Sequence, residues 1–200
     1  HHRRGDKALD HVPPGLLDMV EDARGVVVGV HRHGDAVLVH AALRRVGPML
    51  GGPDALIAAL RDEVGPAGTV LAYTDWQIEP EWTDIPALRE HILPFDPLAS
   101  RANRDNGAFP ELLRTTPGAL RSANPAASCA ALGGRAQWFV ADHALDYGYG
   151  TQSPLGRLMA AEGKTLLLGA PLDTMTLLHH AEHLADIPGQ RVLRYQTPIR

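Results

Sequence analysis

Two apolar segments flank an amphipathic one in the first half of the chain, and this order constrains the fold more than any other feature. Residues 36–40 are apolar on both sides, which is typical of a strand buried in an α/β sheet, and residues 69–73 are the next strand candidate. Between them, the apolar residues of segment 55–64 recur at helical spacing. Strands joined by one helix are usually parallel, with a right-handed crossover. The pattern predicts a β-α-β unit.

Shorter elements are predicted along the rest of the chain. Ser153 stands at an expected helix N-cap, because Pro154 follows it in the first turn. Residues 74–106 form a long loop with aromatic and polar residues, and such a loop inside a compact domain is usually functional. The remaining expectations are helices over 16–20, 109–114, 137–142, 154–161 and 175–185, and strands over 26–28, 128–132, 165–169 and 192–195.

A chain of 200 residues has the size of one domain with a sizeable core. We expect residues 1–10 to be a polar arm or the remnant of a tag, and residues 11–200 to form a single domain. The 44% of hydrophobic and 21% of charged residues are ordinary globular values. They argue against a collagen, coiled-coil or disordered architecture.

The charge balance narrows the class of partner. A net charge of −4 argues against nucleic-acid binding, which needs a basic face, and favours a neutral or cationic small molecule. The single cysteine, Cys129, lies in an apolar run, so we expect a small buried residue rather than a nucleophile or a disulfide partner. No apolar run has the length of a membrane span, and no signal peptide is visible, so we expect a cytoplasmic protein.

The segment His179-His180-Ala181-Glu182-His183 matches the H-x-x-E-H pattern of one class of zinc peptidases. On a helix, His179 and His183 share a face and are spaced to bind one metal ion, with Glu182 beside them as general base. Such a site also needs a carboxylate ligand well downstream, and few residues follow His183. A zinc hydrolase is therefore retained as an alternative, while the preferred site contains no metal.

A second interpretation of the same segment needs only His179 and Glu182. They are three residues apart, hence neighbours on one helix face. A carboxylate beside an imidazole selects its tautomer and raises its basicity, which equips the histidine as a general base for an attacking amine. Thr176, one turn earlier, supplies a hydroxyl that can stabilise an oxyanion. From spacing alone, a solvated surface pair is the commoner explanation of such residues.

Several segments in one order resemble the aminoglycoside 3-N-acetyltransferase family, the antibiotic N-acetyltransferases. They cover most of residues 34–198, and the combination of HALDYGYG at 143–150 with LLHHAE at 177–182 is most similar to the third class of these enzymes. The other segments are VHAALRRVGP at 39–48 with Gly51-Gly52, VGPAGTV at 64–70, YTDW at 73–76, FDP at 95–97, RSANPAAS at 121–128, SPL at 153–155 and LGAPLD at 168–173.

This resemblance implies an α/β fold with a mixed central sheet flanked by helices, unrelated to the common GCN5-type acetyltransferase fold. It implies transfer of an acetyl group from acetyl-CoA to the 3-amino group of a 2-deoxystreptamine aminoglycoside, which confers antibiotic resistance, by a monomer or homodimer. His179 matches the general base of the family, Glu182 its partner, and Thr176 a hydroxyl near the thioester.

The resemblance also suggests where the two substrates bind. The loop after residue 40 offers backbone N–H groups for the pyrophosphate of CoA, and Arg44 and Arg45 add positive charge. The residues expected to contact acetyl-CoA are Ala41, Ala42, Leu43, Arg44, Val46, Tyr73, Ser122, Ser128 and Ser153. Carboxylates and aromatic rings suit a polycationic sugar. The residues expected to contact the aminoglycoside are Asp75, Trp76, Glu79, Asp146, Tyr147 and Tyr149.

Three departures from the family pattern matter. Ala42 replaces a serine found in many relatives, so one hydroxyl contact to CoA is lost. Asn124 replaces a histidine, as it also does in the most similar class. Family members continue beyond Arg200 with a segment that carries acidic residues of the acceptor site. A fragment that binds CoA or an aminoglycoside without turnover is therefore kept as a second alternative.

Overall fold

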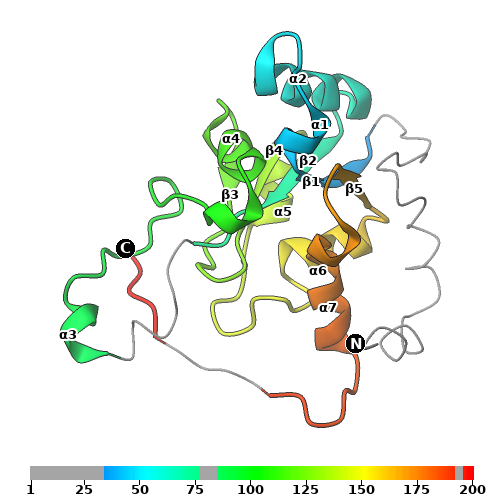
Figure 1. Ribbon diagram of the computed structural model, residues 1–200. Helices are drawn as coiled ribbons and strands as arrows, with labels where there is room; N and C mark the ends of the chain where they lie inside the picture. The colour runs from blue at the N-terminus through cyan, green and yellow to red at the C-terminus, as the bar shows by residue number, and fades with distance from the viewer. Residues whose placement is uncertain (1–33, 77–84, 192–195) are drawn as a thin grey trace, which may run out of the picture.

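The computed structural model describes residues 34–76, 85–191 and 196–200, and its centre is a five-stranded mixed sheet in the order β3-β4-β2-β1-β5 (Figure 1). The strands are β1 (Ala36–Ala41), β2 (Thr69–Tyr73), β3 (Leu120–Arg121), β4 (Cys129–Gly133) and β5 (Lys164–Leu168). β1 pairs in parallel with both β2 and β5, whereas β4 is antiparallel to β2 and β3. The expected mixed α/β sheet is confirmed.

Helices cover both faces of this sheet. α2 and α4 pack on one face, and α5, α6 and α7 pack on the other, with α6 and α7 below β5 in the view of Figure 1. The helices are α1 (Leu43–Val46), α2 (Gly52–Val64), α3 (Pro86–Arg89), α4 (Phe109–Thr115), α5 (Ala136–Val140), α6 (Pro154–Ala160) and α7 (Leu177–Leu184), with short 3₁₀ turns η4 (Arg104–Asn106) and η5 (Leu172–Thr174).

The period-2 alternation of strand side chains divides the core into two apolar layers. Leu38 and Leu71 face α5, α6 and α7, while Val37, Val39 and Val70 face α2 and α4, and all five are almost fully buried. The two layers explain why the central strands are apolar on both sides. They also fix which strand residues point towards α7.

Most of the predicted elements within the described residues are confirmed with shifted ends. α2 begins three residues earlier than expected, because Gly51 adopts a left-handed conformation at its N-cap and Pro53 occupies its first turn. Ser153 is the N-cap of α6, and its hydroxyl accepts a hydrogen bond from the Gly156 N–H at 3.1 Å. The short elements α1, α3 and β3 were not expected. The expectations for 1–10, 16–20, 26–28 and 192–195 lie outside the described residues.

No helix among the described residues is long and apolar enough to cross a membrane.

Candidate active site

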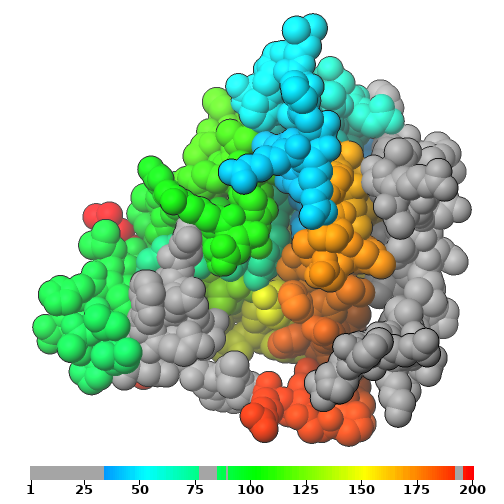
Figure 2. All heavy atoms as spheres, viewed as in Figure 1, coloured from blue at the N-terminus to red at the C-terminus, as the bar shows by residue number. Residues whose placement is uncertain are grey.

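The carboxyl ends of β1, β2 and β5 lie at one edge of the sheet, where open α/β sheets bind their ligands. Ala41 at the end of β1 is level with Leu168 at the end of β5, so the two loops that follow begin side by side. Figure 2 shows the blue segment after β1 against the orange segment after β5 on this face. The sheet therefore brings the loop at 41–46 next to the loop that leads to α7.

The loop after β1 is partly fixed by its own hydrogen bonds. The Ala42 N–H donates to the Leu168 carbonyl at 2.9 Å, so it is not available to a phosphate, contrary to expectation. Leu43 and Arg44 form the first turn of α1, and their N–H groups find no backbone acceptor among the described residues. The exposed Arg45 side chain donates to the Gly169 carbonyl at 3.3 Å.

His179 and Glu182 form the predicted contact on α7. Nδ1 of His179 lies 3.0 Å from Oε2 of Glu182, and the two side chains are 52% and 56% exposed. An ionised carboxylate only accepts, so Nδ1 carries the proton and Nε2 of the neutral ring is left as an acceptor. This is the tautomer that a general base needs.

Two tyrosines and two histidines of α7 form an aromatic cluster along one side of this helix. The ring of Tyr149 lies 5.2 Å from that of His179 and 5.1 Å from that of His183, between ring centroids. The ring of Tyr147 lies 5.4 Å from His183, and its hydroxyl donates to the His183 carbonyl at 3.2 Å. Tyr147 and Tyr149, which were expected to contact the acceptor, thus gather beside the candidate base.

Thr176 and His180 complete the first turn of α7. Thr176 is the N-cap, is buried, and its carbonyl accepts the His179 N–H at 3.0 Å. Its hydroxyl lies 3.5 Å from the Thr174 carbonyl, a long contact. His180 is buried and donates from Nδ1 to the Tyr149 carbonyl at 2.7 Å. The threonine hydroxyl and the candidate base are therefore one turn apart at the same helix end.

The three serines expected to contact acetyl-CoA are bonded within the protein. Ser122, Ser128 and Ser153 are at most 1% exposed. Ser122 accepts the Cys129 N–H, Ser128 donates to the Thr74 carbonyl at 2.7 Å, and Ser153 caps α6. Each hydroxyl thus has a structural role, and its contact with the cofactor stays a prediction.

Tyr73 is also buried at the end of β2, where it was expected near the cofactor. Its hydroxyl donates to the Ala126 carbonyl at 2.8 Å and lies 2.6 Å from the hydroxyl of Tyr149. Burial and the neighbouring Tyr149 raise the pKa of Tyr73 well above its usual value. The Tyr73 hydroxyl therefore stays protonated and donates a hydrogen bond. Tyr149 contacts both Tyr73 and the candidate base His179.

Two other residues expected at the acceptor site, Asp75 and Trp76, make contacts within the loop that follows β2 and its neighbours. Both carboxylate oxygens of Asp75 accept from amides, Oδ2 from Asn103 at 3.2 Å and Oδ1 from Asn106. Burial raises the pKa of Asp75, although these amides oppose the shift. Trp76 packs against Phe95, with ring centroids 5.6 Å apart. Asp146 is exposed near Tyr147, and Glu79 lies outside the described residues.

Three polar residues near this edge were not expected to matter from the sequence. Nε2 of His40 is buried and has no hydrogen-bond partner among the described residues, and burial lowers the pKa of His40 to about 4. Arg121 donates to the Ser128 hydroxyl at 3.0 Å and to the Thr74 and Ser100 carbonyls. His143 is bonded to Ser122 at 2.9 Å. For His40, the sequence signal that could have indicated such a role is a histidine within the apolar strand β1.

Neither a metal cluster nor a reactive thiol is seen in the described part of the chain. No group of three or more His, Cys, Asp and Glu side chains within it is arranged to bind a metal ion. Cys129 is fully buried in β4, and burial raises its pKa, as expected for a small core residue. His183, the second histidine of the zinc pattern, packs against Tyr147 and Tyr149.

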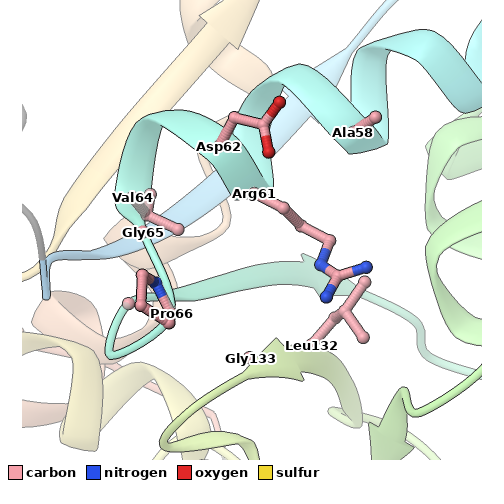
Figure 3. A pocket seen from close by; sticks show the side chains of 9 residues that line it. Ala58, Arg61, Asp62, Val64, Gly65, Pro66, Leu132 and Gly133 are labelled. Atoms are coloured by element: carbon pink, nitrogen blue, oxygen red, sulfur yellow. The ribbon is translucent and has the colours of Figure 1, made fainter.

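A pocket of about 420 Å³ opens at the opposite edge of the sheet (Figure 3). Its walls include Pro66 and Gly133, at the amino end of β2, and Arg61 of α2 reaches across it. Because Gly133 pairs with Thr69 and Cys129 pairs with Tyr73, this pocket is one strand length away from the edge that carries Tyr73. It does not coincide with any predicted site residue.

Comparisons with known proteins all find the same enzyme family. A family model described as aminoglycoside 3-N-acetyltransferase matches residues 38–200. Aminoglycoside N(3)-acetyltransferase III of Pseudomonas aeruginosa is 49% identical over 200 residues, which cover 97% of this chain and 72% of that protein. The structure of AAC-IIIb in a binary complex with CoASH has a TM-score of 0.80 at 62% identity. That of AAC-VIa bound to sisomicin has a TM-score of 0.80 at 42% identity.

The two structural matches cover 84% and 85% of this chain, but only 65% and 66% of the solved chains. The chain therefore spans about two thirds of the length of these relatives. The family model, in contrast, matches most of this sequence, and the identity to the Pseudomonas protein extends along nearly all of it. On this evidence the chain belongs to the aminoglycoside 3-N-acetyltransferase family.

Proposed function

We propose that this protein transfers the acetyl group of acetyl-CoA to the 3-amino group of a 2-deoxystreptamine aminoglycoside, and so confers resistance to the antibiotic. The observation that carries the proposal is the pairing of His179 and Glu182 at 3.0 Å on α7. The β1–β5 register supports it, because it brings the loop at 41–46 beside the segment that leads to this pair.

His179 acts as the general base in this reaction. Its Nδ1–H is held by Glu182, which leaves Nε2 to take a proton from the amine nitrogen as this nitrogen attacks and the N–C bond forms. The thioester carbonyl becomes an oxyanion, and Thr176 offers its hydroxyl one turn away. When the oxyanion collapses, the C–S bond breaks, and the CoA thiolate leaves and takes up a proton. The products are the amide and free CoA, with no acyl-enzyme.

Acetyl-CoA supplies the activated acetyl group, and the loop at 41–46 has the groups to hold its phosphates. The Leu43 and Arg44 N–H groups are unused by the described backbone, and the Arg44 and Arg45 side chains are exposed beside them. The binding of CoASH by a relative at 62% identity supports this assignment. Ala41 and Val46 are the two ends of the loop. The Ala42 carbonyl shapes the loop by accepting the Arg45 and Val46 N–H groups, while the Ala42 N–H is bonded to Leu168.

The acceptor binds next to α7 in this proposal. Asp146 is exposed and supplies negative charge, and the half-exposed ring of Tyr147 offers an apolar face to a sugar ring. A relative at 42% identity binds sisomicin, which supports an aminoglycoside as the acceptor. Asp75 is bonded to Asn103 and Asn106, and Trp76 packs against Phe95. In this proposal the two residues therefore shape the loop.

The direct test is acetyl transfer with purified protein. Acetyl-CoA is incubated with gentamicin-, neomycin- and kanamycin-type acceptors, free thiol is measured, and NMR of the product locates the acetylated nitrogen. Thiol release with acetylation of the 3-amino group is expected. Calorimetry with CoA alone runs in parallel, because binding of CoA without thiol release from any acceptor would favour the non-catalytic alternative. Acetylation of another amino group would overturn the assigned regiochemistry.

A further inference from the structure

Tyr149 is attached to the fold at two points on different elements. The Tyr73 hydroxyl donates its single proton to the Ala126 carbonyl at 2.8 Å, so the 2.6 Å contact between the two phenols is a bond from Tyr149 to Tyr73. The Tyr149 carbonyl accepts the Nδ1–H of His180 on α7 at 2.7 Å. Tyr149 thus joins the end of β2 to the first turn of α7.

The ring between these two attachments lies against the candidate base. The centroids of the Tyr149 and His179 rings are 5.2 Å apart, and the ring planes are inclined by 45°. This is the range in which aromatic pairs attract each other beyond their simple area of contact. On α7 itself, the His179 ring is bonded to Glu182, and the Tyr149 ring also lies 5.1 Å from the ring of His183.

His179 needs this second contact because Glu182 alone does not define its orientation. Both side chains of the pair are more than half exposed, and an exposed imidazole held by one hydrogen bond still rotates between rotamers. A ring packed beside it removes part of that freedom. Catalysis by a general base depends on the position of Nε2 to within a fraction of an ångström.

The hydroxyl of Tyr149 therefore makes its hydrogen bond to another residue of the protein. It was expected from the sequence to contact the aminoglycoside, but its hydroxyl is bonded to the buried Tyr73. We propose that Tyr149 is a positioning residue: its bond to Tyr73 holds its ring against His179, and the ring keeps the imidazole in the orientation that bonds Glu182. This inference rests on the proposed function, in which His179 is the base.

Four variants test the role: Tyr149→Leu, Tyr149→Phe, Tyr73→Phe and the double phenylalanine variant. The primary measurement is the ring ¹⁵N spectrum of His179, assigned by its loss in His179→Gln. In the wild type, Nδ1 is protonated and Nε2 is not. Tyr149→Leu is expected to move both nitrogens towards the average of the two tautomers. Tyr147→Leu is the matched control: its ring contacts His183, and the His179 spectrum is expected to stay unchanged.

The same contacts predict that the variants change kcat and leave KM for acetyl-CoA unchanged. Tyr149→Leu is expected to lower kcat by about 10- to 100-fold without changing KM for acetyl-CoA, as misplacement of a catalytic group does. Tyr149→Phe keeps the ring but loses the bond to Tyr73, so its kcat is expected to lie between those of the wild type and Tyr149→Leu. If the phenol pair acts as one unit, Tyr73→Phe and Tyr149→Phe have similar effects, and the double variant is no worse than either. Thermal melts of each variant exclude loss of the fold as the cause.

The outcomes separate the two proposals. An unchanged His179 spectrum in Tyr149→Leu overturns the positioning role, whether or not turnover is measured. Additive losses in the double variant overturn the coupling through the phenol pair. If His179→Gln keeps more than half of the wild-type rate, the proposed function fails instead, because the base itself is then dispensable.

Discussion

The Ser122 hydroxyl donates a hydrogen bond to Nδ1 of His143 at 2.9 Å, and this bond connects the residue that follows β3 to the segment that precedes Tyr149. His143 completes the connection by donating from Nε2 to the Gly148 carbonyl at 2.7 Å. Because a carbonyl only accepts, the neutral ring has its proton on Nε2. Burial lowers the pKa of His143, so this neutral form is the one that the fold stabilises.

Stability is expected to fall as the pH drops from about 6.5 to about 4. Burial lowers the pKa of His40 from 6.5 to about 4 and also lowers that of His143. Between these values the unfolded chain binds protons that the folded chain does not, so acid favours unfolding, by at most about 3 kcal/mol from His40. Urea midpoints at pH 7 and pH 5 measure the effect. His40→Leu should flatten this dependence, whereas the exposed control His91→Gln should leave it as in the wild type.

His179→Ala is expected to lower turnover by about 10²- to 10⁴-fold and to leave the affinity for CoA nearly unchanged, because a general base acts on the amine and not on the cofactor. Steady-state kinetics and calorimetry with CoA check the two halves of this expectation. Retention of more than half of the wild-type rate would refute the role of His179.

Glu182→Gln is expected to reduce turnover less than His179→Ala does. The amide oxygen of glutamine still accepts the Nδ1–H that Glu182 holds at 3.0 Å, but it no longer stabilises the imidazolium by its charge. Glu182→Leu, which removes the acceptor as well, provides the matched comparison and should be slower than Glu182→Gln. Equal rates for glutamine and leucine would show that the hydrogen bond does not orient the base.

Arg121→Met is expected to destabilise the fold by about 2–5 kcal/mol, because it removes the guanidinium that donates to the Ser100 carbonyl, to the Ser128 hydroxyl and, beside Ser128, to the Thr74 carbonyl. The guanidinium also lies 4.8 Å above the Phe95 ring. Urea unfolding measures the loss, with Arg61→Met on the exposed side of α2 as a control expected to change stability by less than about 0.5 kcal/mol. A loss below about 1 kcal/mol for Arg121→Met would contradict the structural role.

Ser153→Ala separates the capping role of this serine from the cofactor contact that the family resemblance suggests. Loss of the N-cap bond to Gly156 is expected to cost about 1 kcal/mol of stability and to leave the Kd for CoA unchanged. Ser153→Asp, which can also cap α6, should restore most of the stability. A tenfold weaker Kd for CoA in the alanine variant, with unchanged stability, would reinstate the contact to the cofactor.

Local sequence determined the elements and the pair on α7. The apolar runs in β1 and β2, the periodicity of α2 and the serine cap of α6 each depend on residues a few positions apart, and these predictions are confirmed. The contact between His179 and Glu182 is likewise set by the pitch of one helix, because residues three apart lie on one face. Their chemical roles stay predictions.

Tertiary structure decided which polar groups form hydrogen bonds within the protein. Pairing of β1 with β5 places the Leu168 carbonyl where it accepts the Ala42 N–H, and pairing of β3 with β4 buries Ser122 and Ser128 in hydrogen bonds. Tyr149 meets Tyr73 and His179 only because the sheet and α7 are packed together. These contacts join segments far apart in the chain, and no local period records which buried group will find which partner. Local patterns therefore predicted the β-α-β unit and the contact between His179 and Glu182, and the family resemblance added the mixed sheet and the general base as expectations. Packing decided which residues of other segments lie beside His179.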